Sequence, residues 1–333
     1  MSVSPADLER REAERTRLSA GLAVIAGCLA ETGDVWRAHY GAAAIASWLF
    51  RRDAALAPGA EAAAARQTDA MLAAHPPGAR FLAAADVPVP AAEAERAIAD
   101  ALRGTLDGLH WVGHNFIYAA HAISALRALG GWGSAEAIGG IAGLIARFRG
   151  TIPGRSWIGF KAGEVKRLAA ASYDAASMPS DPVRLSAAAL GELAAFKRIY
   201  RAEAHHDLIG HLLTFAHALN ALHDCGYADL FRAGVPQWLA IAEALRAGRD
   251  LPADASPRLV SPVDRLPLRP AARSARLPAE EAFWTRDYAA ADWDFGHVFK
   301  FPCSFYDHLR RAPDGPPAAA AENFRRLLPD VHA

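Results

Sequence analysis

Four histidines stand out along this 333-residue chain because each opens an apolar stretch with helical spacing. His114, His211 and His297 each follow a glycine, and His39 opens a looser stretch of the same kind. The intervals between them are 75, 97 and 86 residues, too irregular for a solenoid of repeats. We therefore interpret the four stretches as inward helices of one bundle, each offering an imidazole at the same level.

The stretch that begins at His297 also holds a lysine. Lys300 lies three residues further on, so both side chains share one face if the segment is helical. It stands between Phe299 and Phe301, and Pro302 follows. A lysine in these surroundings either extends its ammonium group to water or is held buried for a chemical reason.

Neutral imidazole is a good ligand for iron, zinc, copper or nickel, so four convergent histidines predict a metal site. The carboxylate expected beside them is missing, since Asp107, Asp207, Asp294 and Asp307 fall at helix ends or on unsettled faces. An all-histidine site would leave the charge of a divalent ion poorly balanced in an apolar cavity. The alternative is that these are core histidines, bonded to the backbone or to one another.

Three further histidines are secondary candidates: His110, His121 and His217. His110 precedes His114 by four residues, a spacing that suits zinc. His121 lies two turns beyond His114, about 10 Å along a helix, so the two cannot share an ion. His217 follows His211 by six residues, which places it about 120° away around the helix.

Aromatic side chains accompany the histidine stretches, and most of them belong to the core under the simplest interpretation. A few would still line any cavity there. The expected substrate-binding residues are Phe116, Tyr118, Phe215 and Phe299.

Composition excludes several classes of protein. Apolar residues make up 52% and charged residues 22%, with 36 acids and 36 bases, so a basic surface for nucleic acid is not expected. Three separated cysteines, Cys28, Cys225 and Cys303, predict neither a disulfide framework nor a thiolate zinc site. No signal-peptide pattern or membrane-length apolar run is found, which predicts a soluble cytoplasmic protein without a membrane partner.

The chain reads as all-α, a single helical domain over 1–333 arranged around a central metal and substrate cavity. Residues 250–278 are rich in proline and lack helical periodicity, which favours an extended arm over the surface rather than a linker. Apolar periodicity predicts the remaining elements. The expected helices span about 5–31, 35–50, 60–74, 91–102, 107–129, 134–149, 163–173, 185–202, 207–222, 227–245, 279–288, 297–310 and 318–328.

The order of these motifs resembles that of the questin oxidase-like proteins. The resemblance rests on His39 in a helix with Tyr, Gly and Ala, on Gly-His114, on His211-x-x-Thr-x-x-His-Ala and on Gly-His297-x-x-Lys300. It extends from about residue 34 to residue 310. It implies a non-haem iron oxygenase that cleaves anthraquinone-type rings.

Transferred residue by residue, the resemblance implies that His39, His114, His211 and His297 bind Fe²⁺. Lys300, as the carbamate formed with CO2, would be the fifth ligand and the anionic one. Five ligands leave one octahedral position for O2. This ligand set would resolve the charge problem of an all-histidine site.

Three hypotheses follow, and they differ in metal and partners. The first is an iron oxygenase acting with O2 on a small polycyclic aromatic or quinone-like substrate. The second is a hydrolase that uses Zn²⁺ in the same scaffold, and the third is a non-enzymatic helical binding protein with structural histidines. Gly130 to Gly133 follow a helix and form no Rossmann fingerprint, so NADPH would act as an external reductant. A homodimer is compatible with the sequence.

Overall fold

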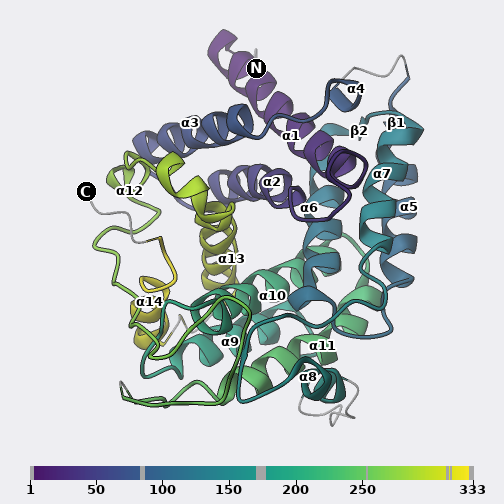
Figure 1. Cartoon of the computed structure of the whole chain (residues 1–333). Helices are drawn as coiled ribbons and strands as arrows, with labels where there is room; N and C mark the ends of the chain where they lie inside the picture. Colours follow the sequence, from purple (N-terminus) through teal and green to yellow (C-terminus); the bar gives the residue numbers. More distant parts are fainter. Residues whose placement is uncertain are drawn as a thin grey trace.

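A computed structural model describes residues 4–82, 87–169, 178–252, 254–312, 315 and 317–329. The described chain is an all-α, multi-helix fold, as predicted, and its strands are pairs of two residues. Its centre is a closed ring of four helices in which each contacts the next (Figure 1). These helices are α2 (Ala38–Asp53), α6 (His114–Leu129), α10 (Leu208–Asp224) and α13 (His297–Arg311).

Other helices cover this ring from outside, so that its inward faces are buried. α1 (Pro5–Thr32) packs on α2 and on α7 (Ala135–Ala146), and its first turns extend beyond the body in Figure 1. α5 (Ala91–Arg103) packs on α6, and α9 (Pro182–Ala194) packs on α10 and α13. The remaining helices are α3 (Pro58–Ala74), α4 (Ala79–Leu82), α8 (Ala162–Ala169), α11 (Ala228–Arg246), α12 (Glu281–Trp284) and α14 (Ala318–Phe324).

Local sequence signals explain how α1 begins and how closely it packs. The side chain of Ser4 accepts a hydrogen bond from the backbone N–H of Asp7, and Pro5 is the first helical residue. Where α1 crosses α2, Gly21 faces Gly41. A Cβ on Gly41 would lie 2.4 Å from the carbonyl oxygen of Gly21, so only glycine allows this approach. This close packing against α1 fixes the position of α2, the helix that carries His39.

Several expected helices are shorter than their apolar periodicity suggests. The helix expected over 107–129 begins only at His114, because Trp111–Gly113 form a separate turn, η1. The helix expected over 185–202 ends at Ala194, and a π-helical turn, η2 (Glu203–Asp207), leads into α10. In 279–288 only the short α12 is helical, and a 3-10 turn, η3 (Ala289–Asp294), follows. Each of these turns precedes a histidine of the ring: η1 precedes His114, η2 precedes His211 and η3 precedes His297.

The proline-rich stretch 250–278 is the extended surface arm that its composition predicts. Its strand β4 (Leu259–Val260) pairs with β3 (Trp157–Ile158). The other strand pair, β1 (Val89–Pro90) with β2 (Gly131–Trp132), does not involve this stretch. The carboxylate of Asp264 accepts hydrogen bonds from the backbone N–H groups of Glu203 and Ala204, both at 2.8 Å. The arm therefore caps the first turn of η2, the turn that leads to the site.

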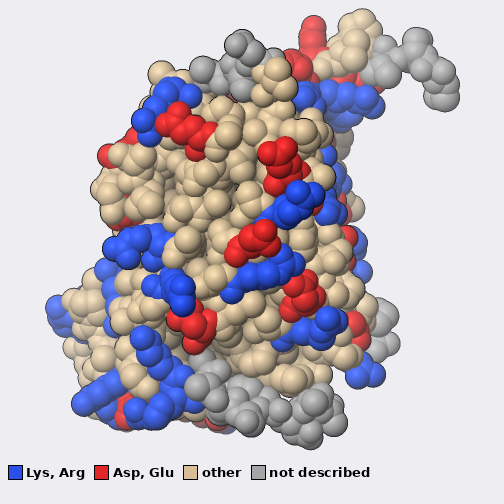
Figure 2. All heavy atoms as spheres, turned by 90° about the vertical axis from the view of Figure 1, so that its right-hand side faces the viewer, with Lys and Arg blue, Asp and Glu red and all other residues tan. Residues whose placement is uncertain are grey.

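The surface shows no single dominant charge on the face drawn in Figure 2, where Lys and Arg lie in mixed groups with Asp and Glu. In the part of the chain that the structure describes, no helix is both long enough and apolar enough to cross a membrane.

Candidate metal centre

The four helices of the ring bring together the four histidines that the sequence singles out. The imidazole of His39 lies 4.6 Å from that of His114, measured between ring centroids. The rings of His114 and His211 are 4.7 Å apart, and those of His211 and His297 are 5.1 Å apart. His297 closes the circle at 6.0 Å from His39. All four are buried, with at most 8% of their surface exposed.

Unusual backbone geometry immediately precedes two of these histidines. In the described chain, the non-glycine residues with positive φ all lie in two short runs. One run precedes Gly113 and His114, and the other precedes Gly296 and His297. They are Trp111, Val112, Asp292, Trp293, Asp294 and Phe295.

Such left-handed residues cost on the order of 1–3 kcal/mol each and concentrate at functional sites. Each run reverses the chain so that the histidine becomes the first residue of a right-handed helix. Apolar periodicity continues through Trp111 and Val112, and this is why it predicted a helix from residue 107 instead of from His114.

His39 and His114 form a close pair whose orientation is fixed from behind. Nδ1 of His39 lies 2.9 Å from the carbonyl oxygen of Trp36, and Nδ1 of His114 contacts the carbonyl oxygen of Trp111. A carbonyl only accepts, so Nδ1 of His114 carries the proton and its Nε2 keeps a lone pair. Nδ1 of His39 also lies 2.5 Å from the hydroxyl of Tyr118, which can donate to it. The two Nε2 atoms lie 2.8 Å apart, a distance that suits either a hydrogen bond from Nε2–H of His39 to Nε2 of His114 or a cation held between two unprotonated nitrogens.

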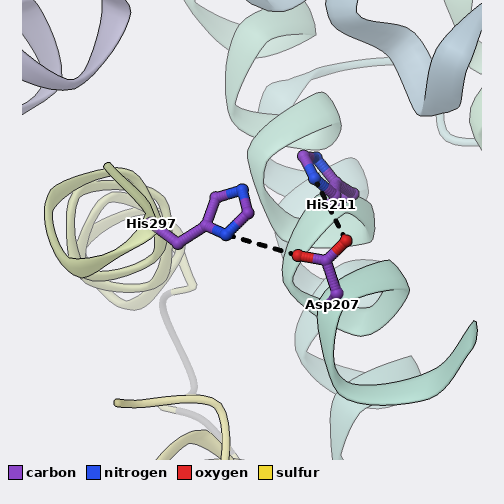
Figure 3. A group of neighbouring side chains, drawn as sticks. All are labelled: Asp207, His211 and His297. Atoms are coloured by element: carbon purple, nitrogen blue, oxygen red, sulfur yellow. Dashed lines mark ion pairs between the residues drawn. The ribbon is translucent and has the colours of Figure 1, made fainter. Parts of the chain in front are cut away.

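Asp207, which we expected to lie outside the site, supplies the missing carboxylate. It lies between His211 and His297 (Figure 3). Its Oδ1 is 3.3 Å from Nδ1 of His297, and its Oδ2 is 3.7 Å from Nε2 of His211. Donor atoms of these three residues all lie within 4.8 Å of one another. The spacing of four between Asp207 and His211 was the sequence signal for this placement, because it puts both on one helical face.

Burial affects both the pKa of Asp207 and the hydrogen bonding of its two histidine partners. Burial first, and then the charges of Asp294 and Glu203, raise the pKa of Asp207 to about 8. Nδ1 of His211 and Nε2 of His297 are buried without a hydrogen-bond partner. These are not the ring nitrogens that face Asp207 but the other nitrogen of each ring. Buried polar atoms are rarely left in this state, and unfilled imidazole nitrogens fit a metal ion.

Lys300 is buried, which is one of the two alternatives that its position between two phenylalanines left open. It is 2% exposed, and burial lowers its pKa to about 7, although Asp207 and Asp294 act in the opposite direction. Burial is the largest cause that lowers the pKa of each of the four histidines, and the charge of Lys300 contributes in every case.

A cavity of about 380 Å³ opens onto this cluster. Trp36, Trp111 and Phe295 form its aromatic wall, and Phe295 lies over the ring of His39 at 4.1 Å. Polar side chains line the rest of the cavity. These are Arg155, Ser156, Arg201, Glu203, His206, Asp207 and Asp294, beside the four histidines.

The four aromatic residues expected to bind substrate lie elsewhere, which corrects that expectation. Phe116, Tyr118, Phe215 and Phe299 are 0% exposed and do not line the cavity. They belong to the histidine helices α6, α10 and α13, but their side chains point into the hydrophobic core and not into the cavity. Tyr118 still serves the site, since its hydroxyl lies 2.5 Å from Nδ1 of His39. The actual wall comes from the turns before the helices, where periodicity is uninformative.

The three secondary histidines are also placed away from the cluster. Because α6 begins at His114, His110 precedes the helix and contacts Asp107 at 3.0 Å, so no zinc-type pair forms with His114. His121 and His217 lie further along α6 and α10, with rings 5.9 Å apart. None of the three lines the cavity.

Comparison of the chain with protein-family models, with curated proteins and with solved structures gives no match.

Proposed function

We propose that this protein is a metal-dependent oxygenase that acts on a flat aromatic or quinone-like substrate. One observation carries the proposal: Asp207, His211 and His297 converge at the floor of an aromatic-walled cavity. Two histidines and one carboxylate with open positions are the ligand set of many non-haem iron oxygenases. The motif order that resembles the questin oxidase-like proteins favours the same chemistry.

The residues present fit such an ion. Unpartnered nitrogens on His211 and His297 and the facing Nε2 atoms of His39 and His114 are neutral donors, and Asp207 is an anionic one. Bound iron would supply the capacity to activate O2. The protein's own part is to hold these donors from rigid helices and to orient two of them through backbone carbonyls.

Substrate binding is assigned to the cavity wall rather than to the core aromatics. Trp36 and Trp111 meet edge to face at 4.6 Å, and Phe295 lies over His39 across the same cavity. A planar ring stacked on this wall would lie directly above the histidine cluster and exclude water from it. Polar groups that also line the cavity, including Glu203 and His206, would bind the oxygen substituents of such a ring.

Lys300 is proposed to carry a carbamate. Its buried amine would attack CO2, so that a nitrogen–carbon bond forms and a proton leaves, giving an anionic oxygen ligand. The basis is its position beside His297 in a cluster that otherwise has one carboxylate. Extra mass on Lys300 after rapid capping of the carbamate would support the assignment, and a bare amine in metal-loaded protein would oppose it.

The proposal is tested by metal analysis together with oxygen consumption. Protein made in iron-replete medium should contain iron and should consume O2 when an aromatic substrate and a reductant are added. His211→Ala should lose the iron, whereas the matched control His223→Asn, which changes a histidine outside the cluster, should keep it. Folded protein that takes up no metal under any condition would refute the proposal.

A metal-dependent hydrolase is the second candidate, and the same donor set favours it. Four histidines, an aspartate and a lysine could equally hold zinc ions that activate water. Tight Zn²⁺ binding with ester or amide hydrolysis that needs no O2 would select this function.

A further inference from the structure

The donor atoms of the site fall into two groups rather than one. His39 and His114 form a pair, with their Nε2 atoms 2.8 Å apart. Asp207, His211 and His297 form a group of three within 4.8 Å of one another, and neither His39 nor His114 belongs to it. The two groups adjoin through the rings of His114 and His211, 4.7 Å apart.

A single metal ion would require its donor atoms to lie closer together than all five of these donors do. Imidazole nitrogens bind a metal at about 2.0–2.1 Å, so two donors on one ion are at most about 4.2 Å apart. Nε2 of His39 and Nε2 of His114 satisfy this limit as a pair. The group of three nearly satisfies it on its own, whereas the five donors do not form one such group in the described chain.

We propose that the site binds two metal ions, one on the His39–His114 pair and one on Asp207, His211 and His297. This inference rests on the proposed function as a metal centre and adds the number of ions and their assignment. Lys300 follows His297 by three residues on α13 and is buried, so it lies on the same side of that helix as His297. A carbamate on Lys300 would add an anionic oxygen ligand there.

Charge then specifies the kind of ligand that the cavity takes. Two divalent ions bring four positive charges, and Asp207 with a Lys300 carbamate would neutralise two of them. Arg155 and Arg201 at the wall are already paired with Glu203 and Asp294. The remaining positive charge would be balanced by hydroxide and by an oxyanion of the substrate, such as a phenolate or carboxylate.

Metal stoichiometry tests the inference. Apo protein is titrated with Mn²⁺ or Zn²⁺ in the presence of bicarbonate, and bound metal is counted after gel filtration. Wild-type protein should bind two equivalents, His39→Ala and His211→Ala about one each, and His223→Asn two. In the Mn²⁺ form, electron paramagnetic resonance should show a coupled pair in wild type and an isolated ion in each single-site variant.

The possible outcomes separate the two proposals. Wild-type protein with one equivalent, lost equally in His39→Ala and His211→Ala, would overturn the two-ion inference and leave the metal centre intact. No bound metal would overturn both. If His39→Ala fails to fold, judged by circular dichroism, His114→Gln provides the same measurement on the other member of the pair.

Discussion

His39 and His114 face each other through Nε2 at 2.8 Å while their Nδ1 atoms lie against backbone carbonyls. Burial is the main cause of the low pKa of both rings, and it holds the pKa of His114 at about 3. Both rings are therefore neutral near neutral pH, and their facing nitrogens are available as neutral donors. The pair supports the proposed metal centre because its geometry suits a cation held between the two rings.

Tyr118 should tune metal affinity without being a ligand. Its hydroxyl contacts Nδ1 of His39 and, at 3.3 Å, the carbonyl oxygen of Val35. Loss of such an outer partner typically reduces metal affinity by about 10–100-fold. We expect Tyr118→Phe to weaken metal binding within this range in competitive chelator titrations. Phe116→Leu, a core change on the same helix, should leave the affinity nearly unchanged, and equal effects of both variants would contradict the assigned role.

Gly113 should be intolerant of any side chain. Its φ is +89°, and an added Cβ would lie 2.5 Å from the ring of Phe215. Gly130 provides a matched control, because its φ is +78° but no atom lies within 4 Å of an added Cβ. Gly130→Ala should cost about 1–2 kcal/mol from backbone strain alone, and Gly113→Ala clearly more, measured by urea unfolding. Equal losses would show that the turn before His114 can relax.

Stability should fall as the pH drops below about 6.5, and His308 contributes to this loss. Burial lowers the pKa of His308 to about 4, and its nitrogens bond Ser186 and the carbonyl of Leu213. Between pH 4 and pH 6.5 the unfolded state therefore binds more protons, so the unfolding free energy rises with pH. Other buried histidines with lowered pKa act in the same direction.

The contribution of His308 can be isolated from the slope of stability against pH. One proton corresponds to roughly 1.4 kcal/mol per pH unit. His308→Gln should make the slope between pH 5 and pH 6 shallower by up to this amount in metal-free protein. Lost hydrogen bonds shift the whole curve but leave its slope unchanged, so an unaltered slope would contradict the prediction.

The sequence was sufficient to predict the all-α fold, the extended arm and the convergence of His39, His114, His211 and His297. These features follow from periodicity and from the recurrence of one residue type. Asp207 was missed because it falls at the start of its predicted helix, where its face was left undecided, although its spacing of four from His211 places both on one side of a helix. Trp36 and Trp111 were missed as the wall because periodicity placed them inside predicted helices. Phe295 was missed because it lies in a left-handed turn between two predicted helices, where periodicity gives no information.

The central claim is that these buried side chains form a metal centre, and elemental analysis tests it most directly. Wild-type protein purified from iron-replete medium, and the same protein reconstituted with Fe²⁺ without oxygen, should contain at least one metal ion per chain. His211→Ala and Asp207→Asn should lose most of it while they remain folded. Well-folded wild-type protein without metal, or variants that retain the full metal content, would contradict the account.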